Sequence, residues 1–353
     1  MEASDARPQW QIRLLSVWQR RGIASALLRP VSMVFGVLVA LRQSLYRCGV
    51  LKTTRLPVTV VVVGNVVVGG GGKTPVVIAL AEHLRSRGIA VGVISRGYGR
   101  RGRDQRKLTA DSLADDVGDE PLLIFRRTGV PVWVGPDRAE AAKALLAEFP
   151  QTEILLCDDG MQDLALARHL EVCVFGSAGI GNGLLLPAGP LREPWPSRWT
   201  TTVPRLFLHA GSQGPRGPAS FQMHRTLDPE LLRADGTRLP LGDLAGRQTC
   251  AVAAIANPQA FFAMLEQAGL RPGRCIALAD QASLKELPAA PQGTTDWICT
   301  EKDATKIWAH HPEVWAARLS LHLEPGFLET FDSALDLNRG ERPVSLGHGH
   351  STA

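Results

Sequence analysis

The chain has 353 residues and a formal net charge of +5, with 45% hydrophobic and 21% charged residues. These proportions are typical of a folded soluble protein, and the length allows a large core and predicts about two domains. The six cysteines are scattered and form no CxxC pair, which argues against a zinc site or a disulfide framework. We expect free core thiols in a reducing cytoplasm.

The N-terminal segment is basic and contains a short apolar run. Residues 1 to 55 carry nine Lys and Arg against two acidic residues, a balance that suits an anionic surface, either phospholipid or nucleic acid. The apolar run Val31 to Leu41 has eleven residues, whereas a helix that spans a bilayer needs about 20. From the residues alone two interpretations are equal: a helix that lies in the membrane interface, or a helical hairpin packed on the protein's own core.

The stretch Val58 to Pro75, VTVVVVGNVVVGGGGKTP, joins a valine run to four glycines, a lysine and a threonine. Valine favours a buried strand, and glycine lets the backbone turn sharply and approach a ligand. With a helix beginning near Lys73, this pattern predicts a phosphate loop, in which Lys contacts the β- and γ-phosphates and Thr binds Mg²⁺. Val67 stands where the common motif has glycine, so the loop is a variant of the form xGGxGKT.

From Pro57 onward the pattern alternates between strands and helices. Expected strands cover 58–63, 91–94, 132–134, 154–157 and 172–175, and expected helices cover 75–87, 119–127 and 137–149. Continuous apolar strands separated by helices indicate a parallel sheet covered on both faces. The sequence therefore predicts an α/β fold with a sheet of the P-loop NTPase type.

The later part of the chain predicts a second, smaller α/β domain. Residues 225–246 are polar and irregular, which suits a connection; strands are expected at 250–255, 275–278, 297–299 and 319–323, and helices at 258–269 and 327–337. We expect four parts: amphipathic N-terminal helices (1–50), which are membrane-associating on the first of the two interpretations above, a nucleotide-binding domain (51–225), the smaller domain (226–340) and a polar tail (341–353).

Acidic residues stand where two of these elements meet loops. Asp158 and Asp159 end an apolar strand, at the sheet edge where open α/β folds bind ligands. Beside a phosphate loop, either can hold the Mg²⁺ that Thr74 also binds. Asp119 and Glu120 begin a predicted helix, and on their own they fit a role in complementing the helix dipole better than proton transfer.

Seven short motifs occur in order along the chain: VGN…GGxGKTP, SRGYG, VGDEP, DDGxQ, GNGxLLPAGPLREP, ANP and TEKDA. In this set the chain resembles the tetraacyldisaccharide 4′-kinases, also called lipid A 4′-kinases, from the N-terminal Trp-rich helix to about residue 306. PAGPLREP and the GDEP/DDG pair are specific to that family, whereas the phosphate loop is shared with many NTPases.

The resemblance implies transfer of the γ-phosphoryl group of ATP, with Mg²⁺, to the 4′-hydroxyl of tetraacyldisaccharide 1-phosphate, an acylated glucosamine disaccharide, to give lipid IVA. It implies a peripheral protein at the cytoplasmic face of the bacterial inner membrane. The anionic membrane surface would be its partner, and neither nucleic acid nor an obligate protein partner is expected. The 51–225 domain would be the kinase domain, and the 226–340 domain would close on it as a lid that excludes water.

The resemblance also assigns roles to residues. Lys73 steadies the β- and γ-phosphates and Asp119 is the base for the sugar hydroxyl, while Arg192 and Glu193 lie in the family's active-site loop. The expected Mg²⁺ ligands are oxygen-bearing side chains: Thr74 with Asp158 or Asp159. The expected ATP-binding loop consists of Val67, Val68, Gly69, Gly70, Gly71, Gly72, Lys73 and Thr74.

Three positions depart from the family's pattern. Gly71 stands where the family usually has Thr or another polar residue, which should be harmless. Asp163 stands where relatives carry a His after the DDG motif. Gln281 stands where relatives carry a His that is thought to orient the catalytic Asp. Either Gln281 orients Asp119 by a hydrogen bond without the charge, or another group takes that part.

The alternative function is a regulatory or partitioning ATPase of the xGGxGKT type that acts as a nucleotide switch. Such proteins carry a signature lysine just before the paired glycines, and this chain has Val68 there, which counts against a switch. A binding module without catalysis is hard to reconcile with so many acidic residues beside a phosphate loop.

Overall fold

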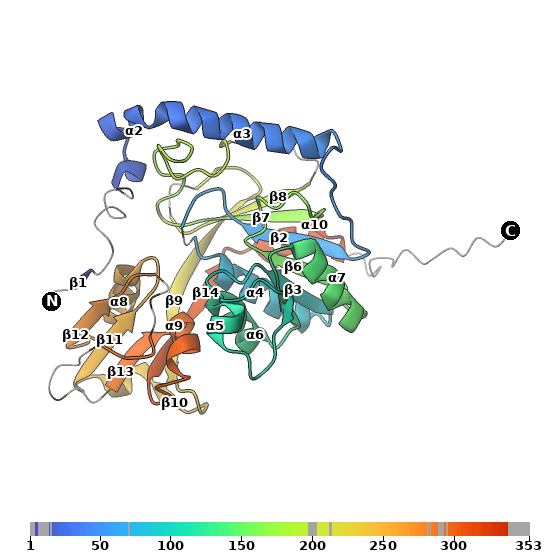
Figure 1. Ribbon diagram of the computed structural model, residues 1–353. Helices are drawn as coiled ribbons and strands as arrows, with labels where there is room; N and C mark the ends of the chain where they lie inside the picture. Colours follow the sequence, from blue (N-terminus) through green and yellow to red (C-terminus); the bar gives the residue numbers. More distant parts are fainter. Residues whose placement is uncertain are drawn as a thin grey trace.

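The computed structural model describes residues 4–5, 14, 16–69, 71–196, 203–211, 214–280, 282, 284–288, 293 and 296–337. A sheet of 14 strands runs through the molecule (Figure 1), in the order β1-β12-β11-β13-β14-β9-β8-β7-β2-β6-β3-β5-β4, with β10 paired to β9. The strands are β1 (Ser4–Asp5), β2 (Thr59–Gly64), β3 (Val91–Ser95), β4 (Arg106–Lys107), β5 (Val132–Val134), β6 (Ile154–Asp158), β7 (Leu170–Phe175), β8 (Arg205–His209), β9 (Ser220–Leu232), β10 (Arg238–Pro240), β11 (Thr249–Ala253), β12 (Arg274–Ala277), β13 (Asp296–Thr300) and β14 (Trp315–Leu323).

Helices cover both faces of this sheet. They are α2 (Ile23–Leu27), α3 (Arg29–Arg47), α4 (Lys73–Ser86), α5 (Ala114–Val117), α6 (Asp119–Thr128), α7 (Arg138–Glu148), α8 (Pro258–Gln267), α9 (Glu301–Ile307) and α10 (Phe327–Ala334), with a 3₁₀ helix at Leu241–Leu244. The predicted α/β fold is confirmed.

The first half-sheet, β8-β7-β2-β6-β3-β5-β4, is parallel except at β4, which runs antiparallel to β5. Successive side chains of β2 point to opposite faces of the sheet, so they contribute to two separate hydrophobic cores. Val61 and Val63 pack with residues of α4, α6 and α10, whereas Val60 and Val62 pack with residues of α7. All four valines are fully buried, because β2 lies inside the half-sheet, between β7 and β6, with helices on both faces.

The second half-sheet, β12-β11-β13-β14, joins the first through β9, a strand of 13 residues that pairs with both β8 and β14. The prediction that residues 225–246 are irregular is therefore wrong, because they include most of β9, all of β10 and a 3₁₀ helix. Only Met223 and Leu231 of β9 are buried, so the strand lacks the apolar pattern by which a strand is predicted. A short helix, α9, also follows β13, where no helix was expected.

Helices α2 and α3 lie outside the layers that cover the faces of the first half-sheet, with loops between α3 and the strands (Figure 1). Ser32 Oγ of α3 donates to the carbonyl of Leu185 at 2.8 Å, and a Cβ on Gly36 would lie 2.9 Å from a methyl carbon of the same leucine. The helix thus docks on the loop around Leu185. None of the helices formed by the described residues is long and apolar enough to span a bilayer.

Candidate active site

The phosphate loop runs from the end of β2 to the start of α4. Gly72 is the N-cap of α4 in the left-handed region, at φ 87°, and Gly69 has φ 110°. A Cβ on Gly71 would lie 3.1 Å from the carbonyl oxygen of Val174, so the backbone there passes close to the neighbouring strand. Lys73 and Thr74 are the first residues of α4, as the motif requires. Gly70 lies outside the described residues.

The proline-rich loop runs antiparallel beside the phosphate loop. Val67 pairs with Leu191 as an isolated bridge. The N–H of Val68 donates to the carbonyl of Pro190, and the N–H of Arg192 donates to the carbonyl of Val66, each at 2.8 Å. These bonds place the Arg192 side chain beside the loop that would hold phosphates.

Asp159 is the point at which the basic side chains of the site converge. Its Oδ1 lies 3.3 Å from Lys73 Nζ and 3.3 Å from Arg192 Nη1. Burial alone would raise the pKa of Asp159, but the charges of Lys73 and Arg192 hold it below its ordinary value. Arg192 also donates to Gln162 Oε1 at 3.2 Å, and Gln162 Nε2 in turn donates to Glu193 Oε1 at 3.4 Å.

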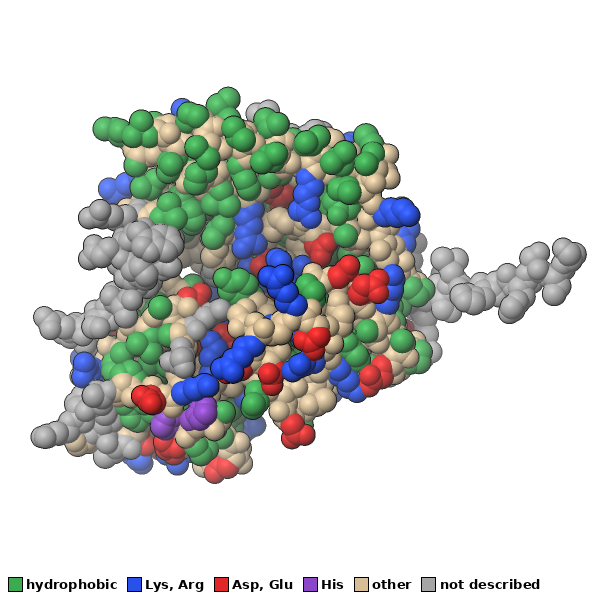
Figure 2. Space-filling view, in the orientation of Figure 1, with side chains coloured by type: hydrophobic (Ala, Val, Ile, Leu, Met, Phe, Trp, Pro, Cys, Tyr) green, Lys and Arg blue, Asp and Glu red, His purple; other side chains and the backbone are tan. Residues whose placement is uncertain are grey.

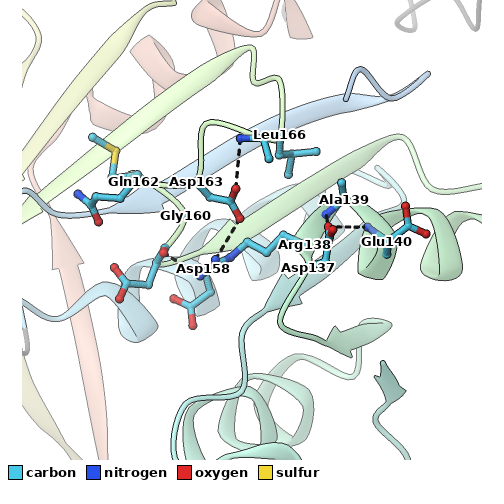
Figure 3. Close-up of polar contacts among 12 residues, drawn as sticks. Asp137, Arg138, Ala139, Glu140, Asp158, Gly160, Gln162, Asp163 and Leu166 are labelled. Atoms are coloured by element: carbon cyan, nitrogen blue, oxygen red, sulfur yellow. Dashed lines mark hydrogen bonds and ion pairs between the residues drawn. The ribbon is translucent and has the colours of Figure 1, made fainter. Parts of the chain in front are cut away.

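Arg138 holds the turn that carries both aspartates (Figure 3). Its Nη2 donates to the carbonyl of Asp158 at 3.2 Å and to that of Asp159 at 2.8 Å, while its Nη1 pairs with Asp163 Oδ2 at 3.2 Å. Asp159 has φ 48°, an uncommon conformation for a residue with a side chain. Asp163, which departs from the family's pattern, thus supplies the counter-charge for the guanidinium that braces this turn.

Asp158 is fully enclosed and carries an unused acceptor. Burial, reinforced by the charges of Glu120 and Asp159, raises its pKa to about 7. Ser95 Oγ donates to Oδ2 at 3.2 Å, but Oδ1 accepts no hydrogen bond from the described residues. A buried acceptor without a donor is a position that a cation would satisfy.

Asp119, at the start of α6, faces α9 of the second half-sheet. Its Oδ2 lies 3.0 Å from Lys306 Nζ and 3.6 Å from Lys302 Nζ, and Lys302 also pairs with Glu120 Oε1 at 2.9 Å. Burial would lower the pKa of Lys302, but the carboxylates of Glu120 and Asp119 raise it above its ordinary value. Asp119 is 3% exposed. Gln281 lies outside the described residues.

These elements surround a cavity of about 680 Å³, a size typical of small-molecule sites. Figure 2 shows acidic and basic side chains gathered in the hollow beneath α3. The cavity is lined by residues from both half-sheets and from α3, among them Arg42, Val68, Gly69, Lys73, Ser95, Glu120, Asp158, Asp159, Arg192, Asp280 and Lys302. The carboxyl ends of β2, β3 and β6 meet at its floor because the three strands are parallel neighbours.

A family model described as tetraacyldisaccharide-1-P 4′-kinase matches residues 24–336. The chain belongs to the tetraacyldisaccharide 4′-kinase family. It is 51% identical over 323 residues to the tetraacyldisaccharide 4′-kinase of Acidovorax sp. strain JS42, covering 92% of this chain and 94% of that one. Its identity to the enzyme of Delftia acidovorans is 44%, with 93% and 96% covered. The crystal structure of LpxK from Aquifex aeolicus in complex with ATP superposes with a TM-score of 0.75 at 26% identity, over 89% of this chain and 99% of the other.

Family membership confirms the resemblance drawn from the seven motifs, and the structure brings most of the predicted site residues together. One cavity is lined by Lys73, Asp158, Asp159 and Arg192. Asp119 is buried behind the wall of this cavity, whereas its neighbour Glu120 lines it. Five other predicted site residues adjoin the cavity without lining it: Val67, Gly71, Gly72, Thr74 and Glu193.

Sequence reasoning missed the residues that support the site from elsewhere in the chain. Arg138 begins a helix expected for its alanine content, and Arg42 belongs to the N-terminal segment. Lys302 belongs to the TEKDA motif, which by itself assigns the residue no role. The TEKDA motif is the one sequence feature that could indicate a role for Lys302, because nothing in the spacing relates residue 302 to residue 119.

Proposed function

We propose that this cavity is the active site of an ATP-dependent kinase that transfers the γ-phosphoryl group of ATP to the 4′-hydroxyl of tetraacyldisaccharide 1-phosphate. Family membership confirms the predicted kinase class and the link to lipid A, and it disfavours a nucleotide switch. The assignment depends on one observation: the phosphate loop, the aspartates 158 and 159 and the Asp119–Glu120 pair all lie around one cavity.

ATP would lie with its phosphates along the loop from Val67 to Thr74. Lys73 pairs with Asp159 in this structure, and it would exchange that partner for the β- and γ-phosphates. Arg192 lies on the other side of Asp159 and would stabilise charge on the transferred group. Glu193 would hold Gln162, and through it Arg192, in place.

Mg²⁺ would be held by Asp158 or Asp159 together with Thr74. The unpaired Oδ1 of Asp158 fits a cation, and carboxylate and hydroxyl oxygens are the ligands that Mg²⁺ prefers. Among the described residues no group of three or more His, Cys, Asp or Glu side chains is arranged to hold a metal. A Mg²⁺ that keeps several waters and binds phosphate oxygens needs only one or two carboxylates.

Asp119 would accept the proton of the 4′-hydroxyl while that oxygen bonds to the γ-phosphorus. The bond between the γ-phosphorus and the bridging oxygen breaks, and ADP leaves. Asp119 lies behind Glu120 and Lys302, so the sugar would reach it only after these side chains move aside. The predicted lid role of residues 226–340 agrees with this need.

The test is incubation of the protein with labelled ATP, Mg²⁺ and tetraacyldisaccharide 1-phosphate. Label should appear in a lipid product with one more phosphate; label found only as free phosphate would overturn the proposal. Asp119→Ala should lower transfer by about 100-fold or more and leave ATP affinity nearly unchanged. An equal loss of transfer and of ATP affinity would rule out Asp119 as the base. Glu120→Gln, at the neighbouring carboxylate, is the matched variant.

We also propose that α2 and α3 bind the membrane surface that holds the lipid substrate. Their outward face carries large apolar side chains that no described residue covers: Ile23, Leu27, Val31, Met33, Val34, Val37, Leu38 and Leu41. Figure 2 shows hydrophobic side chains over the outer surface formed by α2 and α3. Arg42 of the same helix lines the cavity, so the membrane surface and the active site would be adjacent.

Vesicle binding tests this proposal. Val37→Asp replaces an exposed apolar side chain and should weaken binding to anionic vesicles without loss of stability, because the position makes little contact with the protein. Leu113→Asp, at an exposed leucine outside α2 and α3, is the control. Unchanged vesicle binding by Val37→Asp and by a protein lacking residues 1–46 would return this segment to a purely structural role.

A further inference from the structure

Two lysines of α9 reach across from the second half-sheet to the start of α6. Lys302 and Lys306 are four residues apart, so they project from one face of the helix. Thr300 Oγ1 caps α9 by accepting from the N–H of Asp303, and the enclosed Asp303 carboxylate accepts from Thr300 Oγ1 at 2.7 Å and from the N–H of Ala254 at 3.1 Å. These bonds fix α9 on its own half-sheet, so the lysines arrive at α6 from a rigid support.

The two lysines differ in what they contact. Lys302 lines the cavity and lies within ion-pair distance of both Glu120 and Asp119. Lys306 does not line the cavity, and Asp119 is the one carboxylate among the described residues within ion-pair distance of its ammonium. Lys302 therefore keeps a partner if it leaves Asp119, whereas Lys306 does not.

Both oxygens of Asp119 have a partner. Oδ1 accepts a hydrogen bond from the N–H of Glu120 at 3.0 Å, whereas Oδ2 accepts no hydrogen bond from the described residues and is neutralised by the ion pair with Lys306 Nζ at 3.0 Å. The side chain is 3% exposed, so water cannot compensate its charge. A carboxylate in such a place is costly without an opposite charge, and removal of the Lys306 charge would change the orientation of the carboxylate.

We propose that Lys306 is a positioning residue for the phosphoryl transfer: its ammonium holds the Asp119 carboxylate in place where α6 meets α9, while Lys302 moves aside together with Glu120, its partner, as the sugar hydroxyl approaches. This inference rests on the proposed role of Asp119 as base. Lys306 keeps its own proton throughout; the hydroxyl proton goes to Asp119, and the ammonium remains as the fixed charge beside it. Because α6 and α9 belong to different half-sheets, the base is complete only when the two are in contact.

Lys306→Gln in the full chain tests the proposal. We expect kcat to fall by about 100-fold, the scale of general-base catalysis, while the KM for ATP and the Kd for ATP stay within about twofold of wild type. Lys306→Arg retains the charge and should recover most of kcat. Lys285→Gln is the matched control, because Lys285 also pairs across the half-sheets, with Asp115 at 3.8 Å, but is 55% exposed and lies outside the cavity. Its kcat should equal that of wild type.

A double variant separates positioning from general stability. Asp119→Asn combined with Lys306→Met removes both charges and leaves neither one buried alone, so it should fold even if Lys306→Gln does not. Its kcat should equal that of Asp119→Asn, because Lys306 has nothing left to position. A further loss as large as that caused by Lys306→Gln in the wild type would overturn the proposal, as would a loss of kcat that Lys306→Arg does not reverse.

The outcomes also separate this inference from the proposed function. If Lys306→Gln keeps the wild-type kcat while Asp119→Ala loses it, the positioning role is wrong and the base assignment holds. If Asp119→Ala itself keeps transfer, the base assignment is wrong and the inference falls with it.

Discussion

Gly72 closes the phosphate loop in a conformation and a space that only glycine fits. Its φ is 87°, and a side chain in this left-handed region costs about 1–2 kcal/mol. A Cβ at this position would lie 2.6 Å from Nη2 and 2.8 Å from Cζ of Arg225. Arg225 donates from that same Nη2 to the carbonyl of Gly71 at 3.0 Å. The guanidinium therefore cannot withdraw without breaking a bond to the loop.

We expect Gly72→Ala to lower the free energy of unfolding by about 2–3 kcal/mol, from backbone strain together with the loss of one hydrogen bond. The displaced loop should also weaken ATP binding by about tenfold or more, equivalent to at least about 1.4 kcal/mol. Its N–H groups would no longer point at the phosphates from their original positions.

Calorimetric titration with ATP and denaturant unfolding measure the two effects. Gly88→Ala is the control, because Gly88 follows α4 with φ 75° but nothing lies within 4 Å of its ideal Cβ. Gly88→Ala should show the part of the stability loss that comes from backbone strain, about 1–2 kcal/mol, without the loss of ATP affinity. Wild-type ATP affinity in Gly72→Ala, or an equal loss of affinity in Gly88→Ala, would refute the argument that Arg225 fixes the loop.

Three further outcomes follow from the buried charges. Burial raises the pKa of Asp303 to about 6 from an ordinary 3.8, so the native state binds more protons than the unfolded state and the free energy of unfolding falls as the pH rises from about 4 to 6. Urea unfolding should show a loss of up to about 3 kcal/mol over that range relative to Asp303→Asn. Parallel curves of stability against pH for the two proteins would contradict this expectation. Arg138→Leu should raise the Mg²⁺ concentration needed for transfer by about 10- to 100-fold, since it frees the carbonyls of Asp158 and Asp159; an unchanged Mg²⁺ titration would exclude this role. Lys73→Met should weaken ATP binding at least about tenfold, and retained affinity in the same titration would show that Lys73 stays with Asp159.

Much of the nucleotide site follows from local sequence. The valine run of β2 and the apolar residues of β7 favour buried strands, and glycines followed by Lys73 between a strand and a helix predict a phosphate loop. Acidic residues at the end of β6 reach the same edge because parallel strands end together. These features lie within short stretches, so their spacing alone predicts them. The division into the four parts 1–50, 51–225, 226–340 and 341–353 stays a prediction.

Only the tertiary structure decides how charges pair across long distances in the chain. Arg192 stands next to Glu193, yet its ion pair is with Asp159, because the proline-rich loop runs beside the phosphate loop. Asp119 meets Lys306, 187 positions later, because β9 joins the half-sheets so that α9 faces α6. Buried charges pair with whatever opposite charge the packing brings near, and that choice depends on the packing of the backbone and not on distance along the sequence. The sequence therefore determined which chemical groups this kinase has, and the fold decided which of them act on one another.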